Sequence, residues 1–426
     1  MRDAAPSPLV RLPDGTVKQT SPLTGTEVWS VPRRAHRPMS TRAESPRPRP
    51  DHDLVAHRCA FCPGRYLETP PEKARVERDG DAYVLRTGLL ASEVTARVAE
   101  LRRFPNLYEI VGVDFWRADH GWVVPDHVRA RAAAYLAEPE GAAHVAAILR
   151  LRAAAAGAPD AWDALDDDAR VDRAADLFAG THDVVVARRH HVDGAEHGDE
   201  LAGAGTLTPD EHDRFVRFTV EAVRSLYAEQ PHARYVSAFQ NWLRPAGASF
   251  DHLHKQVVAI DEVGPRVGGL LERLRAQPDV VRRRVLDHAR DEGLVVARTD
   301  RAVAVAAVGR PYPSFEVWSL DDGALPWQHD DVALRDMADL LHAVHAATGP
   351  AVPSNEEWYH RPPDADERLP WHVVVARRDA TAAGFEASTG IHVTTTDPRT
   401  LRDAAVTRLR TLRDEGEVAP LTLGDA

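Results

Sequence analysis

Two segments that lie far apart in the chain repeat one pattern of residues. Residues 252–261 read HLHKQVVAID and residues 370–379 read PWHVVVARRD. Each follows a stretch with helical periodicity and at least one strand. Aligning the segments places His254 opposite His372 and His252 opposite Pro370. Because a repeated segment indicates a repeated structural unit, the chain is expected to contain two related units of helices and strands.

The repeat predicts an α+β fold with two antiparallel sheets and helices packed on one side of each. The expected boundary lies near residue 262, so that residues 1–262 form a first domain and residues 263–426 a second. Only the first copy keeps a full set of polar groups. We therefore expect the chemistry to lie in residues 1–262.

Hydrophobic periodicity and turn residues give the expected elements, with residues 39–57 as an irregular loop. Strands are predicted at about 82–87, 183–189, 235–242, 254–261, 294–308, 315–320 and 371–377, and helices at 128–157, 161–178, 209–228, 263–292, 331–347 and 398–415.

Charge and hydropathy exclude two classes of partner. The formal net charge is −12, whereas a protein that binds duplex nucleic acid needs a basic face. No apolar run is long enough to cross a bilayer, so we expect no membrane partner. The N-terminus lacks the pattern of a signal peptide, which predicts a cytoplasmic protein.

The sequence His252-Leu253-His254-Lys255-Gln256 is the strongest candidate for chemistry. On a strand, His252, His254 and Gln256 project from one face. Burying two imidazoles and an amide without partners is costly. A neutral imidazole can act as a nucleophile, and the amide of Gln256 can donate to a phosphoryl oxygen. The alternative is an exposed polar strand face.

Cys59 and Cys62 are the two cysteines of the chain, and they form one CxxC. They therefore predict no disulfide framework. The pair is half of a metal site, a redox pair or incidental. The Pro-Gly that follows disfavours a redox motif, which normally opens a helix. Either His190 or His191, together with His252, could complete a metal site.

Two further features suit a phosphate group. The loop of residues 245–249 is small and turn-forming, and Gly247 and Ser249 could let an anion approach the backbone. The alternative is a tight hairpin turn. Arg34 and Arg37 follow a strand, and guanidinium groups bind phosphate oxygens well.

Together these segments resemble the galactose-1-phosphate uridylyltransferase-like family of the histidine-triad superfamily. The matches follow the family's order and span nearly the whole chain. They are Pro22–Gly25, Arg34–Pro38, Cys59–Gly64, Pro70–Glu72, Arg103–Leu107, Gly180–His182, His190–His191, Asn241, Gly247–Gln256 and Ala383–Glu386. The resemblance implies tandem histidine-triad-like domains.

The resemblance also implies roles for individual residues. It makes His254 the nucleophile that attacks the α-phosphorus of a nucleoside-diphosphate sugar, supported by Gln256. It implies a structural Zn²⁺ held by Cys59, Cys62, His191 and His252. It further implies substrate contacts from Arg34, Arg37, Asn241, Ser249 and Glu386.

The implied activity is nucleotidyl transfer from a nucleotide sugar to a phosphorylated acceptor. An alternative is an adenylyltransferase or phosphorylase acting on diadenosine polyphosphates or ADP-sugars. Arg102 favours this alternative, because the family usually keeps a uridine-contacting asparagine there. A non-catalytic nucleotide-binding protein and a zinc-stabilised scaffold are further hypotheses. Members of the family often form homodimers, so a homodimer is possible.

Overall fold

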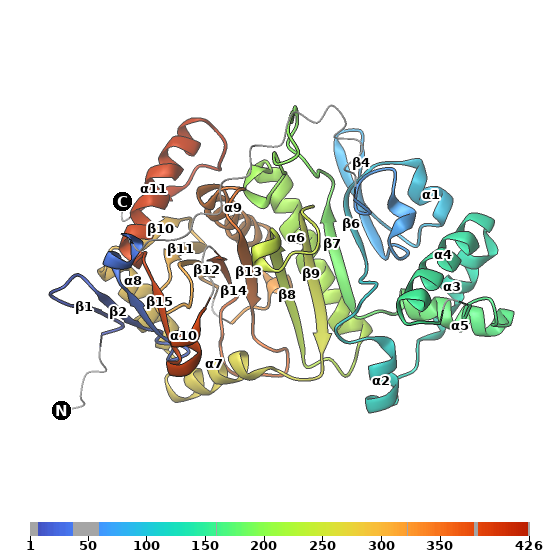
Figure 1. Ribbon diagram of the computed structural model, residues 1–426, viewed down its shortest axis with the longest axis horizontal. Helices are drawn as coiled ribbons and strands as arrows, with labels where there is room; N and C mark the ends of the chain where they lie inside the picture. The colour runs from blue at the N-terminus through green and yellow to red at the C-terminus, as the bar shows by residue number, and fades with distance from the viewer. Residues whose placement is uncertain (1–6, 37–58, 159, 322, 379–381, 425–426) are drawn as a thin grey trace.

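The computed structural model describes residues 7–36, 59–158, 160–321, 323–378 and 382–424. An antiparallel sheet of twelve strands runs through this part of the chain, with helices packed against it (Figure 1). In the order in which they lie side by side, its strands are β16 (Thr422–Leu423), β10 (Val295–Arg298), β11 (Ala302–Ala306), β12 (Ser314–Ser319), β14 (His372–Arg377), β13 (Ser354–Tyr359), β8 (Tyr235–Trp242), β9 (His254–Ile260), β7 (His182–Ala187), β6 (Ala99–Pro105), β4 (Ala74–Asp79) and β5 (Ala82–Thr87).

A smaller sheet joins the beginning of the described chain to its second half. Its strand order is β1 (Leu9–Arg11), β2 (Val17–Thr20), β3 (Glu27–Ser30) and β15 (Ile391–Thr394). β15 pairs with β3 in parallel, and the backbone N–H of Gly309 donates to the side-chain oxygen of Gln19. The division at residue 262 stays a prediction. Strands of the smaller sheet that come from the beginning of the chain contact residues of the second half, on the other side of this division.

Two long helices cover the middle of the large sheet. α6 (Pro209–Glu229) lies against β6, β7, β8 and β9, whereas α9 (Asp331–Thr348) lies against β11, β12 and β14. The N-terminus of α6 is closed by Thr208 and Glu211, each of whose side chains accepts the other's backbone N–H. The remaining helices are α1 (Ala91–Ala96), α2 (Val113–His120), α3 (Asp126–Ala137), α4 (Pro139–Ala155), α5 (Asp167–Phe178), α7 (Pro265–Ala276), α8 (Asp287–Asp291), α10 (Gly384–Thr389), α11 (Pro398–Asp414), the π-helical η5 (Val281–Leu286) and the short 3₁₀ helices η1 (Pro32–His36), η2 (Tyr66–Glu68), η3 (Ala204–Thr206), η4 (Arg244–Ala246) and η6 (Pro326–Gln328).

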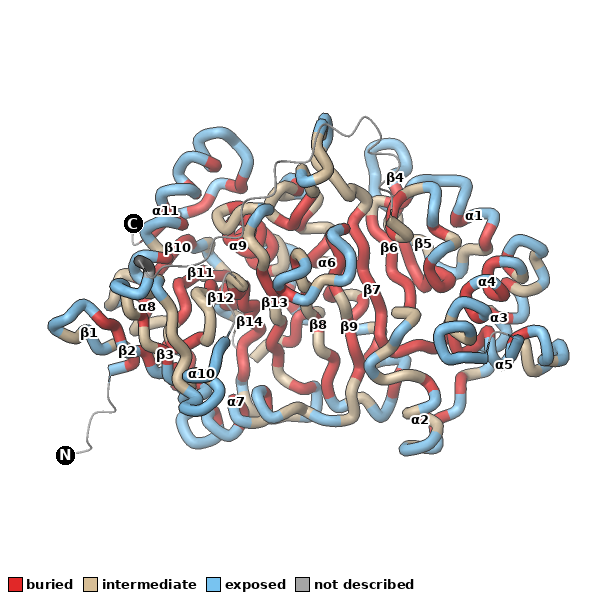
Figure 2. The backbone as a smooth tube through the Cα atoms, in the orientation of Figure 1, coloured by how far each residue is buried: buried red, intermediate tan, exposed pale blue. Residues whose placement is uncertain are grey.

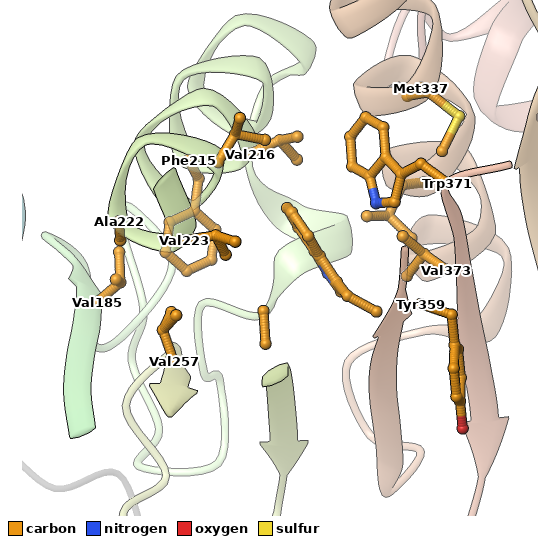
Figure 3. Packing of buried hydrophobic residues seen from close by; sticks show 14 of the residues in the cluster. Val185, Phe215, Val216, Ala222, Val223, Val257, Met337, Tyr359, Trp371 and Val373 are labelled. Atoms are coloured by element: carbon orange, nitrogen blue, oxygen red, sulfur yellow. The ribbon is translucent and has the colours of Figure 1, made fainter. Parts of the chain in front are cut away.

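The core lies between these helices and the sheet. Figure 3 shows Phe215 and Val216 of α6 near the strand residues Val185 and Val257, beside the packing of Met337 and other residues of the second half. Burial of each large apolar side chain contributes about 1.5–3 kcal/mol to stability. The central strands are almost wholly buried, while the helices at the edges of the molecule keep an exposed outer face (Figure 2).

The internal repeat is present in three dimensions. α6, β8 and β9 form the first copy, and α9, β13 and β14 form the second in the same order. β8 and β13 pair with each other, so the two expected sheets are joined edge to edge into one. Lys255 of β9 is buried against Glu356 of β13 and forms an ion pair across this junction. The predicted α+β class with antiparallel sheets is confirmed.

Some elements differ from those expected. The helix predicted at 128–157 is two helices, because Pro139 restricts Glu138 to an extended conformation and begins α4. β6 was not expected, since Arg102 and Arg103 disguise a strand that is buried along almost its whole length. The irregular loop predicted at 39–57 lies outside the described residues. None of the helices in the described segments is long and apolar enough to cross a membrane.

Candidate active site

His254 is the first residue of β9. A hydrogen bond orients its ring and leaves the lone pair of the other ring nitrogen available. The ring is 5% exposed and packs edge-on against Phe61, with centroids 5.4 Å apart. Its Nδ1 lies 2.7 Å from the carbonyl oxygen of His252. Because a carbonyl can only accept, Nδ1 carries the proton and the neutral ring has its lone pair on Nε2. Burial lowers the pKa of His254 to about 4, which keeps this ring neutral at pH 7.

Gln256 lies two residues further along β9 and is oriented by His182 of β7. The backbone N–H of Ile110 donates to Nδ1 of His182 at 3.1 Å, so the proton of that ring is on Nε2. Nε2 of His182 then donates to Oε1 of Gln256 at 2.8 Å. This hydrogen bond fixes which end of the carboxamide is the oxygen. The NH₂ group of Gln256 is therefore left to donate to a ligand.

Asn106 belongs to the same group and was missed in the sequence. It follows β6 directly, and its amide nitrogen lies 3.4 Å from Oε1 of Gln256 and 3.2 Å from Nε2 of His182. Arg102, in contrast, is buried in hydrogen bonds with Glu72 and Thr69. These bonds hold Arg102 inside the protein, and its value as evidence about the base stays a prediction. The signal that could have identified Asn106 is its position at the end of a strand, β6, in the same part of the sheet as β7 and β9.

Four side chains form a cluster with the geometry of a metal site. The Sγ atoms of Cys59 and Cys62 are 3.9 Å apart. Nδ1 of His252 lies 3.5 and 3.6 Å from these two sulfur atoms, and Nδ1 of His190 lies 3.3 Å from Sγ of Cys62. All four candidate ligand atoms lie within 4.8 Å of one another. A tetrahedral zinc ion needs sulfur atoms about 3.8 Å apart and sulfur–nitrogen pairs about 3.5 Å apart.

The protonation states of the cluster also suit a metal ion. Nε2 of His252 donates to the carbonyl oxygen of Ala187 at 2.6 Å, which leaves the lone pair of this ring on Nδ1, facing the sulfur atoms. The hydrogen bond with Cys59 lowers the pKa of the Cys62 thiol, and the thiolate is the form that binds metals. The two cysteines and two histidines can therefore hold a metal ion.

His190 occupies the position that the family resemblance gave to His191. His191 forms a backbone bridge with Leu201, and the N–H of Ala202 bonds the carbonyl of His190. This pairing turns the ring of His190 toward the sulfur atoms. The ring of His191 stacks on that of His190, with centroids 4.5 Å apart, and lies outside the group of four. The geometry thus brings His190, and not His191, together with the cysteines and His252, and a metal ligand at His191 stays a prediction.

β9 begins at His254, as the strand predicted at 254–261 does, so His252 precedes the strand. His252 lies in a bend before the strand, whereas His254 and Gln256 lie on the strand itself. The rings of His252 and His254 still both pack against Phe61. The hydrogen bond from Nε2 of His252 to the carbonyl of Ala187 holds this ring beside β7.

The loop before β9 has the backbone of a small anion-binding turn. Leu243 has a φ of +65° and Gly247 a φ of +92°, both in the left-handed region that costs energy for non-glycine residues. Ser249 is exposed, and neither its N–H nor its hydroxyl has a hydrogen-bond partner among the described residues. Strained backbone with free donors is typical of functional loops.

Asn241 lies beside this loop and is held in place. It is opposite Asn355 in the pairing of β8 with β13, and the amide of Asn355 donates to its Oδ1 at 2.7 Å. Asn355 also donates to the carbonyl of Ala246 and accepts from Arg378 at 2.6 Å. These bonds leave the amide nitrogen of Asn241 directed near Gly247, 3.8 Å from where a Cβ would stand.

A protein-family model covers almost the whole chain. The model described as "Domain of unknown function (DUF4921)" matches residues 12–425. The chain belongs to the DUF4921 family.

Known proteins similar to this DUF4921 chain include plant enzymes. The ADP-glucose phosphorylase of Arabidopsis thaliana is 25% identical over 193 residues, which are 42% of this chain and 55% of that protein. The chain thus spans about half the length of the curated relative that it matches.

Two solved structures share the fold over most of both chains. A crystal structure of an ADP-glucose phosphorylase from A. thaliana with bound ADP-glucose has a TM-score of 0.60 at 18% identity, covering 91% of this chain and 97% of that one. A GalT-like protein from the same plant has a TM-score of 0.57 at 18% identity, covering 91% and 98%. The resemblance to galactose-1-phosphate uridylyltransferase-like proteins is confirmed.

The other predicted substrate residues of this DUF4921 chain lie in short helices next to strands of the smaller sheet, or outside the described residues. Arg34 is exposed on η1, which follows β3. Glu386 lies in α10, where its carboxylate accepts the backbone N–H of Ala383 as a helix cap. Their substrate contacts stay predictions. Arg37 lies outside the described residues.

The second copy of the repeat is closed by aromatic side chains. Nδ1 of His372 lies 3.1 Å from the carbonyl oxygen of Pro370, which repeats the bond of His254 to His252. The ring of His372, however, is fully buried between Trp318 and Tyr359, at centroid distances of 3.8 and 5.0 Å. The equivalent histidine therefore has no open face in the second copy.

Proposed function

We propose that this protein is a nucleotidyltransferase that moves a nucleoside monophosphate from a nucleotide sugar to a phosphate acceptor through a nucleotidyl-His254 intermediate. The observation that carries the proposal is the hydrogen bond between Nδ1 of His254 and the carbonyl of His252, which leaves Nε2 as the nucleophile. The NH₂ group of Gln256, oriented by His182, supports it as a donor for a phosphoryl oxygen.

The proposed reaction has two displacements at one phosphorus atom. In the first, Nε2 of His254 forms a bond to the α-phosphorus, the bond from phosphorus to the bridging oxygen breaks, and a sugar 1-phosphate leaves. In the second, an oxygen of the acceptor phosphate attacks the same phosphorus atom and the N–P bond breaks. The proton on Nδ1 stays in place throughout, where the carbonyl of His252 stabilises the positive charge of the substituted ring.

ADP-glucose is the donor that the relatives favour. The curated relative is named an ADP-glucose phosphorylase, and the structure with the same fold holds ADP-glucose. The second candidate activity is therefore phosphorolysis of an ADP-sugar, in which inorganic phosphate is the acceptor. Both activities use the same first step at His254 and differ in the second substrate.

Zn²⁺ is the ion proposed for Cys59, Cys62, His190 and His252, because two thiolates and two imidazoles in a tetrahedron form a typical structural zinc site. A bound ion would fix His252, whose carbonyl orients His254. The zinc site would therefore act by positioning the nucleophile. A cytoplasmic location and a homodimer stay predictions.

Incubation with a correct donor is expected to add one nucleoside monophosphate to the protein. Intact-mass spectrometry after brief exposure to UDP-glucose, ADP-glucose, GDP-mannose and diadenosine tetraphosphate, each in turn, measures this adduct and identifies its base. We expect ADP-glucose to give the largest adduct. Adding inorganic phosphate or galactose 1-phosphate, neither of which is the leaving group from ADP-glucose, should then remove the adduct, and the faster of the two identifies the acceptor. No adduct with any donor would contradict the proposal.

Replacing His182 should slow the transfer without preventing binding. His182→Phe keeps a ring but removes the bond that orients Gln256. Because misdirecting one donor to the transition state typically costs about 10²-fold, we expect kcat to fall by about that factor with a small change in KM. His232→Phe is the matched control, since His232 is exposed and remote in sequence from the site. Equal rates for the two variants would remove His182 from the mechanism.

A further inference from the structure

A second cavity lies on the helix-covered face of the large sheet, behind the proposed active site. Its volume is about 430 Å³, within the range of small-molecule sites. Its lining comes from α3, α5 and α6, from β5 and β6, and from the chain at the start of β4 and before α3. His182 and Asp183 are successive residues of β7, so their side chains point to opposite faces of the sheet. Asp183 bonds Arg103, which lines the cavity.

The charges at this cavity are out of balance. Lys73 and Arg103 share the carboxylates of Asp183 and Glu229. Arg131, from α3, adds a third cation. It forms no ion pair with any described residue, and one of its nitrogens donates to the backbone carbonyl of Glu72. Glu221 also lines the cavity, but it is ion-paired with Arg224. Of the remaining charged groups, three cations face two carboxylates, and Arg131 is the cation without a carboxylate partner among the described residues.

Both guanidinium groups at the cavity also have unsatisfied donors. Nη2 of Arg103 and Nε of Arg131 are buried and have no hydrogen-bond partner among the described residues. Arg103 as a whole is only 4% exposed. Leaving a buried charged donor without a hydrogen-bond partner is energetically unfavourable. A bound anion would compensate the charge and let these donors make hydrogen bonds after small side-chain adjustments.

In a neighbouring cavity, by contrast, every arginine of the lining is ion-paired. The pocket between α2, α3 and α5 has a volume of about 610 Å³ and is lined by Arg117, Arg129 and Arg173. Each of these arginines forms an ion pair with Asp172 or Asp176. Each arginine of that pocket therefore has a carboxylate partner, which Arg131 lacks among the described residues.

The rest of the lining is apolar. Trp122, Val128, Phe178 and Phe218 contribute side chains, and the guanidinium of Arg131 lies 5.1 Å from the ring centre of Phe178. A ligand with an apolar body and one negative charge would match both parts of the surface. A single uncompensated charge favours a carboxylate over a dianionic phosphate ester.

We infer that this cavity, defined by Lys73, Arg103, Arg131, Trp122, Phe178 and Phe218, binds a small carboxylic acid with an aromatic or aliphatic body. The helices at 126–178 then have a function in addition to packing, because α3 supplies the free cation. This site is separate from the reaction at His254, so its test does not depend on the proposed function.

Benzoate is the probe for this site, and isothermal titration calorimetry of the full chain measures its binding. We expect saturable binding with a Kd of millimolar order, the scale for a ligand of this size. Arg131→Met should weaken binding by about 10- to 100-fold through loss of a charge-assisted hydrogen bond. Arg129→Met, on the same helix but paired with Asp172 outside this cavity, should leave binding unchanged.

Two further measurements separate this site from non-specific binding. Val128→Trp should fill the cavity and abolish benzoate binding while keeping all charges, which protects the test if Arg131→Met fails to fold. Benzamide, of nearly the same shape but neutral, should bind at least about 10-fold more weakly, and phenyl phosphate more weakly than benzoate. No saturable benzoate binding, or equal binding to the wild-type and Val128→Trp proteins, would overturn the inference.

Discussion

The His254→Ala variant will form no nucleotidyl adduct with any donor that labels the wild-type protein. Alanine has no nucleophile, and the neighbouring Gln256 cannot replace it because a carboxamide nitrogen has no available lone pair. Removing a covalent nucleophile lowers kcat by up to about 10⁶-fold. Intact-mass spectrometry measures the adduct, and a single-turnover assay with labelled donor measures the rate.

The internal repeat supplies the control for this experiment. His372 has the same place on β14 and the same bond from Nδ1 to a carbonyl two residues earlier. His372→Phe keeps an aromatic ring between Trp318 and Tyr359, so it should fold and form the adduct at the wild-type rate. Labelling of His254→Ala at that rate would disprove the nucleophile, provided that both variants have the wild-type circular dichroism spectrum.

The residues that could be predicted from the sequence are those whose relations are local. His254 and Gln256 are two residues apart, and a strand brings such residues to one face wherever it lies. Cys59 and Cys62 form a half-site with the spacing that zinc needs. The order of helix and strands around His254 and His372 likewise indicated the repeat, because it requires no knowledge of which strands pair.

The residues that could not be predicted depend on pairing between distant segments. Asn106 and His182 meet Gln256 only because β6, β7 and β9 are neighbours in the sheet. Whether His190 or His191 faces the sulfur atoms depends on the backbone bridge between His191 and Leu201, which lies beyond the end of β7. Such contacts combine distant parts of the chain, and periodicity within one segment carries no information about them.

Two buried arginines are the reason that strand β6 was not predicted. Arg102 and Arg103 are adjacent in sequence, and two successive charged residues do not indicate a buried strand. Each is instead buried on its own face of the strand, Arg102 against Glu72 and Arg103 against Asp183. A buried arginine needs such a partner, and the partner is identified only once the strands are paired.

Replacing Cys62 should remove the metal ion and destabilise the active site together. Sγ of Cys62 is the atom of the cluster nearest to His190, and it also contacts His252. Serine is a poor zinc ligand, so Cys62→Ser should contain less than about a tenth of the wild-type zinc by elemental analysis. Without the ion, His252 loses a constraint on the carbonyl that orients His254, and we expect about 10- to 100-fold slower adduct formation. The melting temperature should fall as well.

His190 and His191 provide a matched pair for this prediction, because they are neighbours of the same type with stacked rings. His190→Ala should lose the zinc, as Cys62→Ser does, since Nδ1 of His190 lies 3.3 Å from a cluster sulfur. His191→Ala should keep one zinc ion per chain. The reverse result would restore the ligand set that the family resemblance implied, and wild-type zinc content in both variants would exclude either histidine as a ligand. If Cys62→Ser keeps the wild-type zinc content, the proposed metal site is wrong. The role of His254 is tested separately, by the nucleotidyl adduct.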